Sequence, residues 1–187
     1  MPTLTIDNQT VIVSEGASVL DAAVALGIVV PHFCYHHALG AVGACRQCAV
    51  TILEGSQKGL KMSCLIAAED GMVVTTGEEE SVAFRKQVSE WLMTNHPHDC
   101  PVCDEGGECQ LQEMTIGAGH GIRRYRGNKR TYTNQDLGPF IAQEMNRCIQ
   151  CYRCVRTYKD YCGGEDFGVM GIHQRVFFGR FKDGPLE

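Results

Sequence analysis

The sequence predicts an α+β fold in which a compact N-terminal unit is followed by small, loop-rich domains built around metal clusters. Three observations lead to this prediction. Residues 1 to about 77 alternate short β-rich runs with one capped helix, and residues 78–94 change to a helical period. Beyond Asn95 the chain is rich in Gly, Cys and His and has little periodicity. A segment of that kind buries little apolar core, so we expect metal centres to hold it together.

Composition narrows the class of protein. The 187 residues include 11 cysteines, and apolar and charged residues make up 44% and 21%, which are ordinary globular values. Seventeen basic and 22 acidic residues give a net charge of −5, which disfavours a nucleic-acid partner. The N-terminus lacks a signal peptide, and the most apolar stretch, 19–31, is too short to span a bilayer. We therefore expect no membrane span, and a reducing compartment in which so many cysteines indicate metal ligation rather than disulfides.

The N-terminal unit shows one clear helix among short strands. Ser18 and Asp21 have the spacing of a capping box, which opens a helix through Leu26 that Gly27 would end. The β-rich runs predict strands, the first two forming a hairpin, at Thr3–Ile6, Thr10–Val13, Ile28–Val30, Ala49–Leu53, Met62–Ser63 and Met72–Thr75.

A longer helix is expected from Glu78 to about Thr94. Its first turn holds the acidic residues 78–80, which suit the positive end of the helix dipole. One face carries an apolar stripe that we expect to pack against neighbouring elements, formed by Phe84, Val88, Trp91 and Leu92.

The first cysteine group is Cys34, Cys45, Cys48 and Cys64. Three of its members lie on one Gly-containing loop and the fourth comes from a later segment, which is the general layout of a [2Fe-2S] ferredoxin site. Ten residues separate Cys34 from Cys45, whereas the plant type has four at this place. The alternative is a zinc site with four thiolates, but such sites usually bring two close pairs and this group has one.

The second group is His96, Cys100, Cys103 and Cys109. Three thiolates on a short loop suit one face of a [4Fe-4S] cluster, and His96 could supply the fourth ligand. An imidazole in place of a thiolate removes one negative charge and should raise the reduction potential. His98 competes for this role, although it has little room to reach around the cluster. Zinc bound by the cysteines, with both histidines outside the site, remains the alternative.

The third group is Cys148, Cys151 and Cys154, the spacing typical of a [4Fe-4S] cluster. Its fourth ligand is less clear. Cys162 follows after seven residues and lacks the proline found in bacterial ferredoxins. We favour a buried thiol at Cys162 and a fourth ligand elsewhere.

Other features give weaker signals. The basic run 123–130 contains one aromatic residue, but in an acidic chain a solvated face or a protein contact is the better interpretation. No Walker loop, dinucleotide fingerprint or nucleophile elbow is present, so we expect no nucleotide site and no substrate site.

These groups resemble a known family. The stretches 45–50 (CRQCAV), 94–108 (TNHPHDCPVCDEGGE) and 134–156 (NQDLGPFIAQEMNRCIQCYRCVR) are similar to the N-terminal part of the G-type subunits of bacterial NADH:quinone oxidoreductases, respiratory complex I. The similarity extends over essentially the whole chain.

The resemblance implies the fold and the ligands. It implies a ferredoxin-like β-grasp domain at 1–78 with one [2Fe-2S] cluster, whose ligands are the first cysteine group. A domain at 79–118 would hold a [4Fe-4S] cluster on the second group, with His96 chosen over His98. Residues 119–187 would begin a second [4Fe-4S] domain on the third group, with the fourth ligand beyond Glu187 in a longer subunit. The chain would thus hold one [2Fe-2S] and one to two [4Fe-4S] clusters.

The resemblance also implies a function. The chain would relay electrons from NADH and FMN on a partner subunit towards quinone on others, in a proton-translocating oxidoreductase on the cytoplasmic side of the inner membrane. It would be peripheral there and would have no active site of its own. Two alternatives remain at this point: the diaphorase part of an NAD-reducing hydrogenase, and a zinc-binding structural protein.

Overall fold

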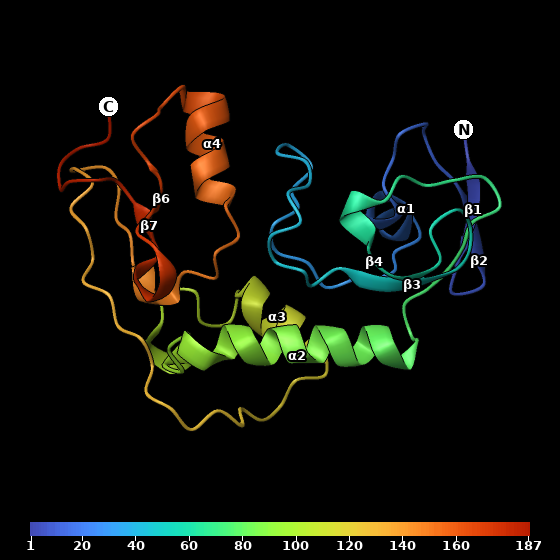
Figure 1. Cartoon of the computed structure of the whole chain (residues 1–187), viewed down its shortest axis with the longest axis horizontal. Coiled ribbons are helices and arrows are strands. Elements are labelled where there is room, and N and C mark those ends of the chain that lie inside the picture. The colour runs from blue at the N-terminus through green and yellow to red at the C-terminus, as the bar shows by residue number, and fades with distance from the viewer.

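The computed structural model describes the backbone of residues 1–187 and every side chain except that of Gln174. It is an elongated α+β molecule, which confirms the predicted fold class (Figure 1). The helices are α1 (Val19–Ala25), α2 (Glu79–Asn95), α3 (Gln110–Gly117) and α4 (Arg153–Cys162). The strands are β1 (Thr3–Ile6), β2 (Gln9–Ile12), β3 (Ala49–Glu54), β4 (Gly59–Met62), β5 (Val73–Thr75), β6 (Gly168–Met170) and β7 (Phe177–Gly179). Short 3₁₀ turns lie at Ser63–Leu65, Cys100–Val102, Met145–Arg147 and His173–Arg175.

The N-terminal unit is built on a mixed five-stranded sheet in the order β2-β1-β5-β3-β4. β1 and β2 form an antiparallel hairpin, while β1 and β5 run parallel in the centre, which is the arrangement of a β-grasp domain. The hairpin turns at Asp7 and Asn8, whose φ angles are +47° and +66°. Positive φ at both central positions is the type I′ pattern that matches the twist of paired strands.

Helix α1 covers one face of this sheet. Its capping box is present as predicted, because Ser18 Oγ accepts from the Asp21 N–H at 3.1 Å and Asp21 Oδ2 accepts from the Ser18 N–H at 2.9 Å. Gly27 ends the helix at φ +72°, a conformation that favours glycine. The core between α1 and the sheet contains Leu4, Ile6, Val19, Leu20, Val50, Ile52, Met72 and Val74.

We expect Leu20→Ala to lower the free energy of unfolding by about 2–5 kcal/mol, because the Leu20 side chain is fully buried in this core and its removal leaves a cavity. Val24 lies on the same helix but is 58% exposed, so Val24→Ala should change stability by no more than about 0.5 kcal/mol. Denaturant unfolding followed by circular dichroism measures both. Equal losses in the two variants would contradict this account of the core.

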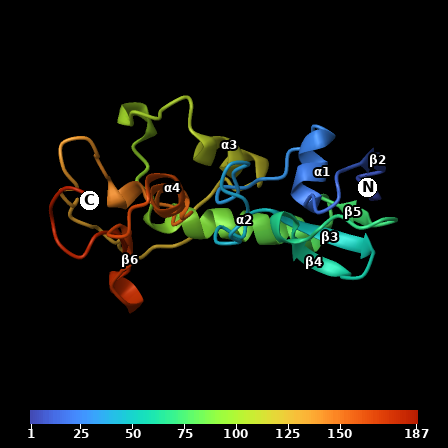
Figure 2. The same ribbon diagram turned by 90° about the horizontal axis from the view of Figure 1, so that it is seen from above.

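Helix α2 leaves the sheet and runs along the long axis of the molecule (Figures 1 and 2). Its N-terminal half is held by Arg85, which donates to the Ala49 carbonyl at 2.6 Å and to the Thr76 carbonyl at 2.7 Å. The predicted apolar stripe is only partly correct. Val88 is buried, but Trp91 is 61% exposed.

Three local predictions need correction. Ile28–Val30 is not a strand: the chain turns away before Pro31, which cannot donate to a sheet. The strand expected at Met62–Ser63 starts earlier, at Gly59, and Ser63 belongs to the following 3₁₀ turn. The region beyond Asn95 is more regular than expected, because it contains α3, α4 and the β6–β7 hairpin. No helix among the described residues has the length and apolar character needed to cross a membrane.

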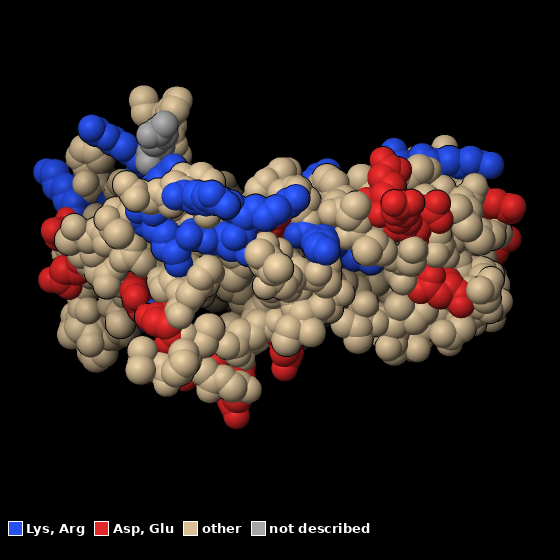
Figure 3. All heavy atoms as spheres, turned by 90° about the horizontal axis from the view of Figure 1, so that it is seen from below, with Lys and Arg blue, Asp and Glu red and all other residues tan. Residues whose placement is uncertain are grey.

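The basic run 123–130 packs against the C-terminal half of α2. Arg124 bonds both carboxylate oxygens of Glu90, through Nε at 3.0 Å and Nη2 at 2.5 Å, and this bonding lowers the pKa of Glu90 to about 2. Arg123 donates to the Thr94 carbonyl at 3.1 Å. Figure 3 shows Lys and Arg gathered in a band across this face. The run therefore packs within the chain and also presents a charged face. Its positive charge compensates the negative C-terminal end of the α2 dipole.

In Glu90→Gln we expect trypsin to cut within 123–130 several-fold faster than in the wild type. The carboxylate that holds Arg124 is lost, so the segment leaves α2 more often and becomes a substrate. Glu80→Gln is the matched control, since Glu80 is exposed in the first turn of the same helix. Unchanged cleavage in Glu90→Gln would show that the segment is held by other contacts.

Candidate metal centres

The four cysteines of the first group come together beside the sheet. Cys34 and Cys45 lie in the long loop between α1 and β3, Cys48 directly precedes β3, and Cys64 lies in the turn after β4. All four are buried. The sulfurs of Cys48 and Cys64 are 3.2 Å apart, and the Cys34 thiol contacts those of Cys45 and Cys64.

The crowding of these thiols governs their ionisation. Hydrogen bonds from Cys45 and Cys64 lower the pKa of Cys34, and a bond with Cys64 lowers the pKa of Cys48 to about 7. The same bonds, made to Cys34, raise the pKa values of Cys45 and Cys64. Four thiolates this close repel one another, so all of them ionise only beside a compensating cation. Iron supplies that charge, and the donor set therefore fits a [2Fe-2S] cluster.

The loop around this group is shaped by special backbone positions. Gly40 and Gly43 both have φ +68°, and a Cβ on Gly43 would strike Leu65 Cδ1 at 2.7 Å. Arg46 also takes a positive φ, +56°, between two of the cysteines. Its neighbour Gln47 is fully buried and donates to Ser89 Oγ of α2 at 2.7 Å. This loop is therefore fixed to the helix as well as to the sheet.

The second group surrounds a largely apolar cavity of about 430 Å³ between the end of α2 and α3. Gly106 makes the turn tight, since a Cβ there would lie 2.6 Å from the Cys100 carbonyl. The cavity is lined by all four predicted ligands, His96, Cys100, Cys103 and Cys109. Three thiols and an imidazole around an apolar cavity of this kind are a donor set that fits a [4Fe-4S] cluster.

His96 has the features of a ligand. Within the described part of the chain its Nδ1 is buried and makes no hydrogen bond, and such atoms are rare in folded proteins without a function. Burial lowers the pKa of the ring, which keeps it neutral with a lone pair to donate. Lys129 donates to the His96 carbonyl at 2.5 Å and fixes the backbone. His98 also lines the cavity, but neither of its ring nitrogens is both buried and without a hydrogen-bond partner.

The third group lies in the loop before α4. The Gln150 N–H donates to Cys148 Sγ at 3.4 Å, and burial raises the pKa of Cys148 to about 11. Gln150 and Tyr152 have φ angles of +56° and +63°, so the backbone turns left-handed twice between the cysteines. Strained positions of this kind concentrate at functional loops.

Cys162 does not join the third group. It is exposed at the far end of α4, which corrects the expectation of a buried thiol. It lies eight positions after Cys154 on the helix, a distance of about 12 Å along the axis. Cys162 therefore lies too far away to share a cluster with Cys154 while α4 is intact.

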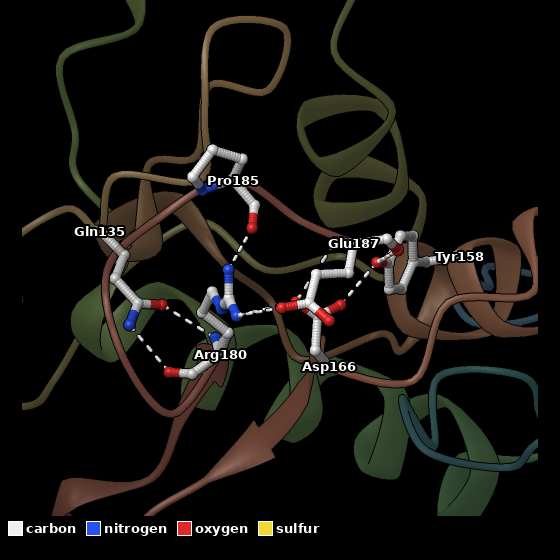
Figure 4. Close-up of polar contacts among 6 residues, drawn as sticks. All are labelled: Gln135, Tyr158, Asp166, Arg180, Pro185 and Glu187. Atoms are coloured by element: carbon white, nitrogen blue, oxygen red, sulfur yellow. Dashed lines mark hydrogen bonds and ion pairs between the residues drawn. The ribbon is translucent and has the colours of Figure 1, made fainter.

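A polar network connects the segments of the C-terminal part of the chain, residues 133–187 (Figure 4). Arg180, which follows β7, exchanges two bonds with Gln135, at 2.8 Å and 2.9 Å, and pairs with Asp166 at 3.2 Å. Tyr158 of α4 donates to Asp166 at 2.5 Å, which raises the pKa of the phenol to about 12. The network ties α4, the hairpin and the 133–138 segment into one body.

All three groups meet at one apolar cluster. Phe33 and Leu111 are buried at its centre together with Cys34 and Cys45 of the first group. Cys109 of the second group and Cys151 of the third pack against the same residues. Sequence reasoning missed Phe33 and Leu111, because neither has a motif that distinguishes it from other core residues. Among the described side chains, no three His, Cys, Asp or Glu residues are arranged so that they could hold a single metal ion.

Comparisons with known proteins agree with this arrangement. Residues 1–79 match a 2Fe-2S iron-sulfur cluster binding domain, residues 85–124 the NADH-ubiquinone oxidoreductase-G iron-sulfur binding region, and residues 138–187 the ferredoxin-like domain of NADH-quinone oxidoreductase subunit 3. These matches show a [2Fe-2S] cluster and [4Fe-4S] clusters as the cofactors of the chain.

Relatives extend the match over the full length. The chain is 58% identical to the G-type subunit of NADH-quinone oxidoreductase from Pseudomonas putida and 56% identical to that from Escherichia coli K12, in each case over 100% of this chain and 21% of the relative. The chain thus spans about a fifth of the length of these relatives. A crystal structure of an NAD+-reducing [NiFe]-hydrogenase is similar with a TM-score of 0.86 and 28% identity, covering 100% of this chain and 80% of that one. Across its whole length, the chain therefore belongs with the N-terminal iron–sulfur region of the G-type subunits of NADH-quinone oxidoreductase.

Proposed function

We propose that the chain is an electron relay with three cluster sites. The [2Fe-2S] cluster would bind Cys34, Cys45, Cys48 and Cys64, and the first [4Fe-4S] cluster His96, Cys100, Cys103 and Cys109. The second [4Fe-4S] cluster would bind Cys148, Cys151 and Cys154, with its fourth ligand beyond Glu187 rather than at Cys162. The corresponding domains are 1–78, 79–118 and 119–187.

The observation that carries this proposal is the shared apolar cluster. Cysteines of all three groups contact Phe33, Leu111 or their neighbours, so the three centres would be separated by a few side chains only. Electron transfer between clusters weakens steeply with distance, and close packing in a low-dielectric interior favours it. The chain needs no substrate site of its own: it holds the clusters and sets their potentials through ligand type and hydrogen bonds.

The relatives suggest where the electrons come from and go. We infer a place in a proton-translocating NADH:quinone oxidoreductase, in which a subunit that binds NADH and FMN supplies electrons and other subunits carry them to quinone. The other subunits of the peripheral arm would be the partners. The chain would lie peripherally on the cytoplasmic side of the inner membrane.

A second function is favoured by the structural likeness to an NAD+-reducing hydrogenase. The chain could serve as the iron–sulfur diaphorase part of such an enzyme. The higher identity to the quinone oxidoreductase relative, 58% against 28% for the hydrogenase, favours the first function. Copurification of the tagged chain distinguishes the two, because a nickel-containing partner would indicate a hydrogenase.

Electron paramagnetic resonance of the anaerobically purified, dithionite-reduced chain tests the proposal. We expect a [2Fe-2S] signal and at least one [4Fe-4S] signal, with spins and iron counted per chain. A spin count that includes a second [4Fe-4S] cluster would mean that a fourth ligand is available within the 187 residues. A folded, colourless, zinc-loaded protein without signals would overturn the relay in favour of a structural zinc protein.

A further inference from the structure

We propose that Arg156, supported by Arg153, is a positioning residue that sets the reduction potential of the [2Fe-2S] centre from another domain. Both arginines lie on α4, one on either side of Cys154 of the third group, and reach across to the loop that begins at Cys34. The inference rests on the proposed ligands of the [2Fe-2S] cluster.

The contacts of Arg156 all fall on this loop. Its Nη1 donates to the carbonyl of Cys34 at 3.1 Å, and its Nη2 donates to the carbonyls of Gly40 at 2.9 Å and of Leu39. Cys34 is a member of the first group, so the guanidinium bonds the peptide of a proposed ligand. More than a hundred residues separate the partners in the sequence.

Two neighbours on α4 reinforce this contact. Arg153 donates to the Tyr35 carbonyl at 2.7 Å, and Tyr161 donates to the Ala38 carbonyl at 2.5 Å. All three side chains therefore bond backbone carbonyls of the same loop, within residues 34–40. Figures 1 and 2 both show α4 beside the loop that carries Cys34. Helix α4, which follows the loop of the third cysteine group, therefore packs against the loop of the first group.

No carboxylate of the described side chains neutralises the charge of these arginines. Among the described residues, neither Arg153 nor Arg156 forms an ion pair with a carboxylate, and their guanidinium groups bond carbonyls and the Gln110 amide instead. A thiolate-bound [2Fe-2S] cluster is an anion that gains a further negative charge on reduction. A cation beside it that pairs with no carboxylate, in a partly buried position, favours the reduced state and raises the potential.

The hydrogen bonds act in the same direction. A guanidinium on a peptide carbonyl polarises that peptide and strengthens its N–H as a donor. Stronger donors around a cluster stabilise its more negative, reduced form. The arginines belong to the proposed domain at 119–187, whereas the [2Fe-2S] ligands belong to the proposed domain at 1–78. The two domains would therefore form one electrostatic unit.

The test is the midpoint potential of the [2Fe-2S] signal in the full chain, measured by redox titration with electron paramagnetic resonance detection. In Arg156→Gln, which keeps an amide donor but loses the charge, we expect a lower potential than in the wild type. Arg156→Lys restores the charge and should return most of the shift. Arg126→Gln is the matched control: Arg126 is exposed in the segment that runs beneath α2, on the opposite side of that helix from α4 in Figure 1, and its loss should leave the potential unchanged.

The remaining outcomes would reject either the role of Arg156 or the proposed cluster ligands. An unshifted potential in Arg156→Gln with a lowered melting temperature would show a purely structural clamp and overturn the inference. An equal shift in Arg126→Gln would show a general effect of net charge and also overturn it. If Arg156→Gln loses the cluster, Arg153→Gln replaces it, and an unshifted potential there would reject the proposal. Absence of a [2Fe-2S] signal in the wild type would instead reject the ligands themselves and the proposed function with them.

Discussion

In the Cys48→Ala variant we expect the [2Fe-2S] signal to disappear and the iron content to fall by about two atoms per chain. Cys48 is 1% exposed, and its sulfur lies 3.2 Å from that of Cys64, so the substitution removes a buried thiol that directly faces another proposed ligand. Electron paramagnetic resonance and iron analysis of the same anaerobic preparation measure the loss. The [4Fe-4S] signals should remain, because the second and third groups lie on separate loops.

Cys162→Ala is the matched control for that experiment. Cys162 is exposed at the end of α4 and lies outside the three groups, so all signals should persist. If the [2Fe-2S] signal survived in Cys48→Ala, the first ligand set would be wrong. If Cys162→Ala lost a [4Fe-4S] signal, α4 would have to unwind in the loaded protein to bring this thiol to the third group.

The second large effect is expected in His96→Cys. A thiolate in place of the imidazole adds a negative charge to the cluster, so the midpoint potential of the corresponding [4Fe-4S] signal should fall. His96→Ala should instead lose the signal, because it removes the ring whose Nδ1 is buried without a partner and leaves three thiols as the proposed ligands. Redox titration of both variants gives the measurement.

His98→Ala serves as the comparison for His96. The two histidines line the same cavity two residues apart, so the alanine variants differ only in which ring is lost. We expect the His98 variant to keep its cluster with a nearly unchanged potential. Loss of the signal in His98→Ala but not in His96→Ala would exchange the two roles.

Features with local signals were predictable from the sequence. The capping box at Ser18 and Asp21, the hairpin at 7–9 and the grouping of the cysteines each depend on residues a few positions apart, and the structure contains all three. The helix that begins after Glu78 was also expected, with its acidic first turn. The ligand assignments themselves stay predictions until the variants above are measured.

Features that depend on distant packing were not predictable. Trp91 shares the helical period of Val88, but its burial depends on elements far away in the sequence, and it is largely exposed. The role of Arg156 is visible only once α4 lies against the Cys34 loop. Phe33 and Leu111 look like ordinary core residues in the sequence, and only the fold shows that they lie between the cysteine groups.

Helix α2 acts as a spacer of fixed length and phase. Its N-terminal half is fixed to the first site through Gln47 and Arg85, and His96 of the second site follows its last residue. The eleven residues from Arg85 to His96 extend about 16 Å, and each inserted residue would add about 1.5 Å and turn the histidine by about 100°. An insertion or deletion between Arg85 and His96 would therefore shift the second site relative to the first even if every ligand were kept, whereas the loop at 55–58 between β3 and β4 has no such constraint.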